Sequence, residues 1–518
     1  MRFRFSIGWH CSNDSLLPRQ RYRVVAAILS VFVGCVSVGT TNSALSADSR
    51  SVPNIVLILI DDMGWRDLGC YGSTFYRTTH IDRLCGQGMK FTQAYTACNV
   101  CSPTRASIMT GRYPARLHLT NFIPGRRIPE NSPVLPPDYK LQLDLEEVTI
   151  AEALKPAGYV SGSFGKWHLG NIPTHGPDKQ GFDVFNAQPP RKPGDPKGIA
   201  TLTQQAMDFL EKNQDRPFLL YLPHFAVHIP LEGKKELIAK YEAIRDANKS
   251  RVPSPPAPLP ERERGDVLAP KGEKGELLET REKPGQVQDN ALYAAMIESL
   301  DDGIGQLLAK LDELKLADRT VVFFFSDNGG LAVHEGPNTP ATSNAPLRAG
   351  KGYLYEGGVR EPLMARWPGV IKPASLCDVP VCSVDFFPTI LEIAGIKPPA
   401  DRAIDGVSIL PLLKQSGTIR RDALYWHYPH FSNQGGMPGG SVRQGDFKLI
   451  EFYADHHLEL YNLKNDMSET NNLAAEMPEK AQHLRFMLDL WRKAVDAQPM
   501  LRNPDYDPAK PTHYATGN

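Results

Sequence analysis

Three short and almost uninterrupted hydrophobic runs stand out along the chain. They are NIVLILI at residues 54–60, PFLLYL at residues 217–222 and TVVFFFS at residues 320–326. Runs of this length are typical of central strands that are covered on both faces, as in parallel sheets. Helix-like stretches lie between them, and the clearest is residues 291–314, with an apolar position at every third or fourth residue. Its apolar stripe consists of Ala294, Ile297, Leu300, Ile304, Leu307, Leu308 and Leu311. The alternation predicts an α/β fold with helices packed on a mostly parallel sheet.

The pattern changes after about residue 415. Short strand-like stretches follow at residues 424–428, 441–452 and 458–462, and then an amphipathic helix that carries Leu484, Leu488 and Trp491. Consecutive short strands without helices between them favour a separate antiparallel sheet. We therefore expect a smaller C-terminal subdomain at residues 416–518, which ends in a loosely held tail from residue 503.

The large domain is expected to span residues 48–415. Within it, residues 251–288 are rich in proline and charge, which predicts a surface insertion with little core of its own. The 518 residues carry a formal net charge of +0, with a pI of about 7.2. Such a balance gives the protein no global electrostatic attraction to nucleic acid or to an anionic membrane surface. Any anion must therefore be held by a local site.

The first 47 residues are typical of an export signal. Arg19, Arg21 and Arg23 precede an apolar run at residues 24–38, and small residues follow at positions 44–47. The run is short for a bilayer span, and no other segment could cross a membrane, so we expect a periplasmic or secreted protein with no integral span. A buried helix is the alternative interpretation, and lipid anchoring at Cys35 also stays open. In an oxidising compartment Cys377 and Cys382 are the closest candidates for a disulfide, although sequence does not fix connectivity.

Two of the predicted strands end in polar pairs. Asp61 and Asp62 follow the first run, and Asp327 and Asn328 follow the third. Ligands of open α/β sheets bind at the carboxyl ends of strands, where unpaired buried carboxylates are costly without a cation. Three carboxylates and one amide oxygen suit a hard cation, Ca²⁺ or Mg²⁺. The alternative is that these residues cap the helices that follow.

A cysteine opens the segment CSPTRASIMTG at residues 101–111. Ser102 is a candidate helix cap, Pro103 suits a first helical position and Gly111 suits a helix end. Cys101 would then lie at a helix N-terminus, where the thiol is acidified, and Arg105 adds a fixed charge and a bidentate oxyanion donor. An ordinary buried cysteine before a helix is the alternative.

With these motifs the chain resembles the formylglycine-dependent sulfatases. CSPTRASIMTG matches their C/S-x-P-x-R signature, and residues 158–168, from Gly-Tyr to Gly-Lys-Trp-His, match the second signature of that family. Further matches are IDDMGWRDLGCYG at residues 60–72, HIP at 228–230, SDNGG at 326–330, LRAGKGYLYEGGVREPLMARWPG at 347–369 and YNLKNDMSETNNLA at 461–474. They follow the family's order along nearly the whole chain after residue 47.

The resemblance implies a fold similar to that of alkaline phosphatase. In that fold a large, mixed and mostly parallel sheet is sandwiched by helices, beside a smaller C-terminal antiparallel sheet. It also implies that Asp61, Asp62, Asp327 and Asn328 bind calcium. Cys101 corresponds to the residue that a separate maturation enzyme oxidises to formylglycine. Its aldehyde hydrates, and one hydroxyl, activated by the metal, attacks sulfur in line.

The remaining site residues are also carried over by matching position. Arg105, Lys166 and Lys351 correspond to the cations that hold the sulfate oxygens. His168 corresponds to the group that helps the second hydroxyl lose its proton, and His228 to the residue that protonates the leaving alcohol. Without the signature, Lys166 and His168 would be interpreted as surface residues after a strand. His118 and His430 fall where this family builds its substrate pocket.

The expected function is hydrolysis of sulfate monoesters, with a sulfated sugar or glycan as substrate. Two alternatives belong to other classes. One is a phosphodiesterase or phosphonate monoester hydrolase of the same superfamily, although the sequence shows no histidine-rich second metal set. The other is a carbohydrate-binding relative without catalysis, against which the intact cysteine, metal set and histidines argue.

Overall fold

The computed structural model describes residues 52–125, 128–190, 192–251 and 287–510. The predicted export signal at residues 1–47, with the alternative anchor Cys35, lies outside these ranges. Most of the predicted insertion at residues 251–288 also lies outside these ranges. Across the described part of the chain, no helix is long and apolar enough to span a bilayer.

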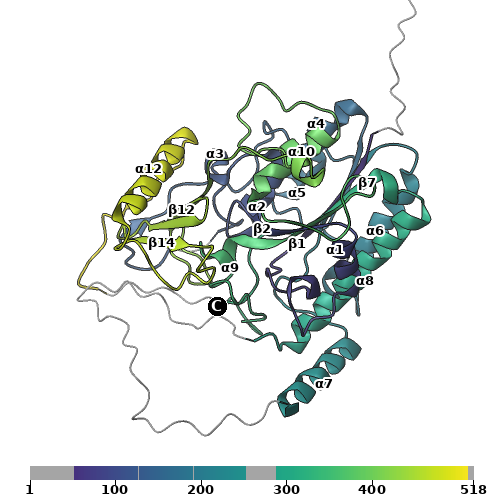
Figure 1. The fold of residues 1–518 in the computed structure, drawn as a ribbon, viewed down its shortest axis with the longest axis horizontal. Helices are drawn as coiled ribbons and strands as arrows, with labels where there is room; N and C mark the ends of the chain where they lie inside the picture. Colours follow the sequence, from purple (N-terminus) through teal and green to yellow (C-terminus); the bar gives the residue numbers. More distant parts are fainter. Residues whose placement is uncertain (1–51, 126–127, 191, 252–286, 511–518) are drawn as a thin grey trace, which may run out of the picture. The chain divides into compact units, whose positions relative to one another are not determined.

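A mixed sheet of nine strands forms the centre of the described chain (Figure 1). Its order is β10-β2-β8-β7-β1-β6-β4-β5, and β9 pairs with β2 off this path. The strands are β1 (Asn54–Ile60), β2 (Met89–Tyr95), β4 (Val160–Phe164), β5 (Val184–Asn186), β6 (Phe218–Pro223), β7 (Thr320–Ser326), β8 (Arg360–Arg366), β9 (Ser375–Cys377) and β10 (Val381–Cys382). The three predicted core strands β1, β6 and β7 are adjacent, fully buried and parallel.

Strand direction decides which loops meet. All neighbouring pairs are parallel except the two made by β8, which is antiparallel to β2 and to β7. The carboxyl ends of the parallel strands therefore share one edge of the sheet with the amino end of β8. Six segments converge there: those that follow β1, β2, β4, β6 and β7, and the one that precedes β8.

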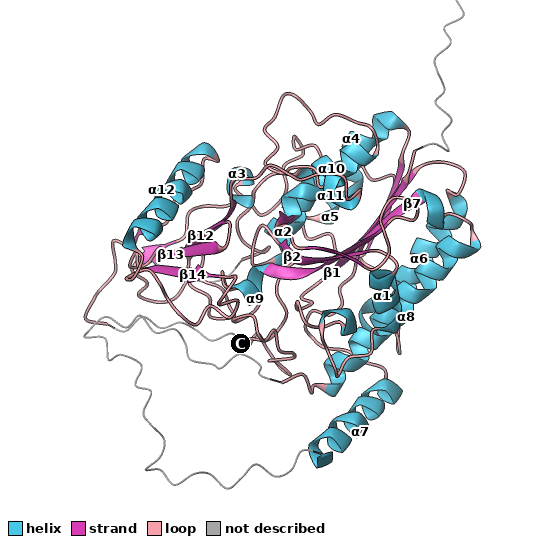
Figure 2. Ribbon diagram, viewed as in Figure 1, coloured by secondary structure: helices cyan, strands magenta, loops and turns pink. Residues whose placement is uncertain are grey.

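Helices cover both faces of this sheet (Figure 2). Alternate residues of β1 point to opposite faces, with Val56, Ile58 and Ile60 in one buried cluster and Ile55, Leu57 and Leu59 in the other. The first cluster is completed by α1 (Thr79–Gly86), α6 (Ile199–Lys212) and α8 (Ala291–Glu313), with α7 (Lys235–Arg251) packed outside them. The second is completed by α2 (Cys101–Thr110), α4 (Ile150–Leu154), α10 (Phe386–Ile393) and α11 (Leu410–Leu413). The predicted stripe on residues 291–314 is confirmed, since all seven of its residues are buried.

The C-terminal region forms a second sheet. Its four antiparallel strands are β11 (Leu424–Tyr428), β12 (Gly439–Gln444), β13 (Phe447–Phe452) and β14 (Leu458–Asn462). The predicted helix, α12 (Pro478–Ala494), covers one face with Leu484 and Leu488, while the other face packs against the large sheet through Trp426 and Ile450. The architecture expected from the resemblance, a mostly parallel sheet between helices beside a smaller antiparallel sheet, is confirmed.

A buried ion network joins the two sheets. The Nζ atom of Lys448, on β13, lies 3.0 Å from Glu356 Oε1 and 3.0 Å from Glu469 Oε1, and all three side chains are fully buried. The other oxygen of Glu469 accepts the backbone N–H of Glu356 at 2.7 Å. Glu356 opens α9 (Glu356–Val359), which leads into β8. The C-terminal region therefore holds in place the segment that precedes β8, at the edge of the sheet where the six segments converge.

Two expectations about the chain are wrong. Residues 503–510 are not a loose tail, because the Asn503 N–H donates to the Pro133 carbonyl oxygen and Asn131 exchanges hydrogen bonds with Asp507. They follow directly on the pairing of β15 (Leu501–Arg502) with β3 (Val134–Leu135). Cys377 and Cys382 are free thiols rather than a disulfide. They align with Phe91 and Tyr95 of β2, four positions apart, about 13 Å in a strand and beyond the reach of a disulfide.

Candidate active site

At the edge of the sheet where these segments converge, six segments bring together the predicted catalytic and metal-binding residues. Asp61 and Asp62 follow β1, Cys101 begins α2 after β2, and the Lys166–His168 loop follows β4. His228 follows β6, Asp327 and Asn328 follow β7, and Lys351 precedes β8. Gly165 allows the β4 loop to approach β6, since its φ is 129° and an added Cβ would lie 1.9 Å from the Pro223 carbonyl oxygen. The Lys166 N–H donates to that same oxygen at 2.7 Å.

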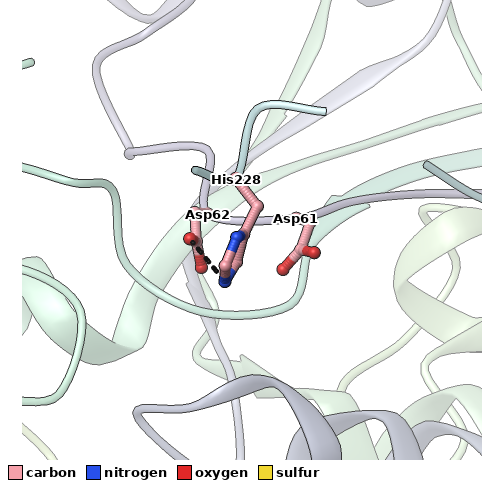
Figure 3. A group of neighbouring side chains, drawn as sticks. All are labelled: Asp61, Asp62 and His228. Carbon is pink, nitrogen blue, oxygen red and sulfur yellow. Dashed lines mark ion pairs between the residues drawn. The ribbon is translucent and has the colours of Figure 1, made fainter. Parts of the chain in front are cut away.

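The acidic residues form a compact group around the ends of β1 and β7. One ligand atom each from Asp61, Asp62 and His228 lie within 4.8 Å of one another, as do one each from Asp61, Cys101 and Asp327. Figure 3 shows the imidazole of His228 between the carboxylates of Asp61 and Asp62. Asn328 Nδ2 donates to Asp62 Oδ1 at 2.8 Å, and the Asp62 N–H donates to Asp327 Oδ1 at 3.3 Å. The four side chains predicted as metal ligands therefore lie together.

The charges and unpaired atoms of this group fit a cation. Burial and the neighbouring Asp61 carboxylate raise the pKa of Asp327 well above its usual range. Burial opposes ionisation of Asp61 as well, but Lys166, His228 and Arg105 together hold its pKa below the ordinary value. Asp61 Oδ1 and Asn328 Oδ1 are buried oxygens without a hydrogen-bond partner. Unpaired carboxylate and amide oxygens in a buried acidic group are the donors that Ca²⁺ and Mg²⁺ take in proteins.

Cys101 is the first residue of α2 and is 2% exposed. Gly111 ends the helix with a left-handed φ of 69°, as predicted. The predicted cap is wrong: Val100 holds the N-cap position without a side-chain bond, and Ser102 Oγ instead accepts the N–H of Ile123 at 3.2 Å. Ser102 therefore fastens the segment around residue 123 to the cysteine helix.

His168 faces the cysteine with a defined tautomer. Its Nε2 lies 2.6 Å from the carbonyl oxygen of Ile123, and its Nδ1 lies 3.3 Å from Cys101 Sγ. Because a carbonyl only accepts, Nε2 carries the proton and Nδ1 presents its lone pair to residue 101. Burial, with Lys166 nearby, lowers the pKa of His168 to about 3, so the ring is neutral and can accept a proton.

The cationic residues are each tied to an acidic partner. The fully buried Arg105 donates from Nε to Asp327 Oδ2 at 2.8 Å and from NH1 to the Lys166 carbonyl at 2.6 Å. Lys166 Nζ lies 2.6 Å from Asp61 Oδ2. The charge of Arg105 therefore lies against Asp327, a carboxylate oxygen of which is within 4.8 Å of Cys101 Sγ, and most of the Arg105 donors are engaged within the site.

Lys351 and His228 meet at Asp62. Lys351 Nζ lies 2.9 Å from Asp62 Oδ2, and His228 Nε2 lies 3.6 Å from that oxygen. His228 Nδ1 is 2.6 Å from the carbonyl oxygen of Ile229, so Nδ1 carries a proton and Nε2 faces the acidic group. Burial and Lys351 lower the pKa of His228, which makes the protonated ring a stronger acid.

The two predicted substrate-contacting histidines do not join this cluster. His118 Nε2 lies 2.9 Å from the backbone oxygen of Asp496, beyond the end of α12. His430 is buried, with Nε2 2.8 Å from Thr120 Oγ1 and its ring packed against Tyr139. His430 therefore supports the segment that carries Ile123, and its contact with substrate stays a prediction.

Sequence reasoning missed two groups of the site. The Ile123 carbonyl fixes the tautomer of His168, but a backbone oxygen leaves no residue-type signal. Glu335 lies 3.0 Å from Lys351 Nζ through Oε2. It stands in an irregular loop eight positions beyond Asp327, where neither strand periodicity nor a signature marks it.

Comparison with known proteins adds to this geometry. The family model described as Sulfatase matches residues 53–396, and the one described as N-sulphoglucosamine sulphohydrolase, C-terminal, matches residues 349–495. A protein named Sulfatase from Formosa agariphila is 32% identical over 85% of this chain and 87% of its own length. Human N-acetylgalactosamine-6-sulfatase is 32% identical over 72% of this chain and 68% of its own length.

Solved structures agree with the fold. The crystal structure of Ps i-CgsB in complex with k-i-k-neocarrahexaose superposes with a TM-score of 0.68 at 26% identity. It covers 86% of this chain and 94% of the solved chain. The similarity therefore extends over both the large sheet and the C-terminal sheet.

Proposed function

This chain belongs to the sulfatase family and is a sulfuric ester hydrolase, and from that premise we propose that Cys101, oxidised to formylglycine, supplies its nucleophile. The observation that carries the proposal is the position of Cys101. Its Sγ lies within 4.8 Å of carboxylate oxygens of Asp61 and Asp327 and 3.3 Å from His168 Nδ1. The thiol stands where the oxygen atoms of a hydrated formylglycine would lie, between an acidic cation site and a neutral base.

Asp61, Asp62, Asp327 and Asn328 are the proposed ligands of a divalent cation, Ca²⁺ or Mg²⁺. Two of their oxygens lack partners, which supports the assignment. A cation there would supply electrostatic stabilisation of a developing oxyanion and lower the pKa of a nearby hydroxyl.

A formylglycine at position 101 supplies, in its hydrate, a hydroxyl that can attack sulfur and a second hydroxyl through which the aldehyde re-forms. We assign His168 the role of accepting the proton of that second hydroxyl, because its Nδ1 is unprotonated and points at residue 101. Arg105, Lys166 and Lys351 provide fixed positive charge for the sulfate oxygens. His228 is the proposed proton donor to the leaving alcohol: as an imidazolium it gives up the Nε2 proton and keeps the Nδ1 proton on the Ile229 carbonyl oxygen.

The proposed substrate is a sulfated sugar or glycan. Relatives over most of the chain include a protein named for N-acetylgalactosamine-6-sulfate hydrolysis, and Ps i-CgsB was solved with a neocarrahexaose. We also propose export to the periplasm or medium, together with a separate enzyme that oxidises Cys101. Both follow from the sequence pattern of residues 1–47 and from the CSPTR motif.

The matured enzyme is expected to release sulfate from an aryl sulfate with a far higher kcat/KM than phosphate from the matching aryl phosphate. A phosphate monoester carries more negative charge than a sulfate monoester. The two metal-competent groups around Cys101 among the described residues share Asp61, which suits a single cation. Sulfated and unsulfated oligosaccharides compared by released sulfate would then identify the sugar. A preference for the aryl phosphate would favour the phosphoester-hydrolase alternative.

Removal of the cation is expected to abolish turnover and to lower thermal stability. Without it the buried carboxylates repel one another, and the site loses its electrostatic stabilisation of the oxyanion. A ligand that binds only the folded state adds about 2.7 kcal/mol at about 100 times its Kd. Chelator treatment followed by Ca²⁺ or Mg²⁺ addition should reverse both effects. Full activity in a sample shown by elemental analysis to contain no divalent metal would contradict the site.

A further inference from the structure

Lys351 is held between two carboxylates rather than one. Its Nζ lies 2.9 Å from Asp62 Oδ2 and 3.0 Å from Glu335 Oε2, and it also donates to Glu335 Oε1 at 3.0 Å. The three side chains are 4%, 0% and 7% exposed for Lys351, Asp62 and Glu335, so water contributes little to balancing their charges. The ammonium therefore depends on both anions for its position.

A cation at the acidic group changes this balance. Asp62 would share its charge with a divalent cation, and an ammonium 2.9 Å from the same carboxylate oxygen would be repelled by that cation. Glu335 belongs to neither of the metal-competent groups that contain Asp61, within the part of the chain that the structure describes. Its charge stays available to Lys351 whether or not the cation is bound.

We propose that Glu335 is a positioning residue that anchors Lys351, so that the lysine and a divalent cation can both occupy the Asp62 side of the site. The inference rests on the proposed function, which places the cation at Asp62 and Lys351 against the sulfate. Glu335 acts through Lys351 and touches neither the sulfate nor the reacting atoms.

The backbone around Glu335 is itself held in place. The N–H groups of Glu335 and Gly336 donate to Thr339 Oγ1 at 2.9 and 3.1 Å, which fixes the turn that presents the carboxylate. Burial opposes its ionisation, but Lys351 and His228 hold the pKa of Glu335 below its usual value, so it remains an anion.

The test is a double-mutant cycle read out as Ca²⁺ affinity rather than as activity. In Glu335→Gln the ammonium of Lys351 rests on Asp62 alone and competes with the cation. Titration calorimetry of chelator-stripped full-length protein should therefore show a Kd for Ca²⁺ raised roughly tenfold. In a Lys351→Met background the competing ammonium is gone, and Glu335→Gln should change the Kd by no more than about threefold. Glu335→Asp keeps the charge and should retain most of the affinity.

Glu298→Gln is the matched control, because it also removes a carboxylate from a lysine, Lys240, but in an ion pair between helices α8 and α7. It should leave the Kd unchanged. Equal effects of Glu335→Gln in both backgrounds would mean that Glu335 acts as a distant charge. That result would overturn this inference and leave the proposed metal site intact. A wild-type protein that binds no Ca²⁺ would overturn the proposed metal site and this inference with it.

Discussion

Replacing Cys101 with alanine is expected to abolish turnover while the fold and the cation site remain. At position 101 the oxygen of a hydrated formylglycine would meet both His168 Nδ1 and the carboxylates of Asp61 and Asp327. Loss of a covalent nucleophile in a hydrolase costs on the order of 10⁶-fold in kcat. Calorimetric Ca²⁺ binding should persist, because alanine removes no proposed oxygen ligand. Released sulfate, measured with an aryl sulfate, reports the loss.

Cys98→Ala is the matched control for this prediction. Cys98 is also buried, its Sγ donates to Asn99 Oδ1 at 3.4 Å, and burial raises the pKa of the thiol to about 12. An inert buried thiol of this kind should be replaceable with little loss of activity. Peptide mass spectrometry should find formylglycine at position 101 and unmodified cysteine at position 98. An active preparation that carries only unmodified Cys101 would contradict the proposed mechanism.

The parts of the fold that could be predicted are those that local pattern determines. Strands β1, β6 and β7 are apolar on both faces because helices cover both sides of the sheet, and a continuous run records that burial directly. The carboxyl ends of parallel strands share an edge of the sheet. The sequence therefore allowed the prediction that the acidic and amide residues after β1 and β7 lie close together. The strand pattern alone did not place Lys351 at that edge, because it lies there only through the antiparallel direction of β8.

The failures have a common physical origin in long-range contacts. Ser102 has the side chain of a helix cap, yet it bonds to Ile123, a partner set by tertiary packing. The tail from residue 503 has no hydrophobic pattern, but hydrogen bonds from Asn503 to Pro133 and between Asp507 and Asn131 hold it. Glu335 reaches Lys351 across an irregular loop with no periodicity. Signatures shared with the sulfatase family located the reacting groups, whereas the residues that hold them required the structure.

Replacing His228 with alanine is expected to slow a sugar sulfate far more than a nitrophenyl sulfate. A sugar alkoxide is a poor leaving group, so its departure depends on a positioned acid, typically worth ~10²–10⁴-fold. A nitrophenolate leaves without a proton and needs that help much less. His228 is suited to the role, because Nδ1 is held by the Ile229 carbonyl and Nε2 faces the acidic group. The measurement is kcat/KM for both substrates in the wild type and the variant.

His168→Ala is the comparison variant for His228→Ala, measured with the same two substrates. His168 contacts residue 101, so its loss should affect both substrates about equally, whichever alcohol leaves. Both variants must be compared at equal formylglycine content, since uneven maturation would imitate a rate defect. If His228→Ala slows the two substrates equally, His228 holds sulfate or the cation site instead. Lys351, which contacts the same oxygen of Asp62, would then be the next candidate for the proton donor.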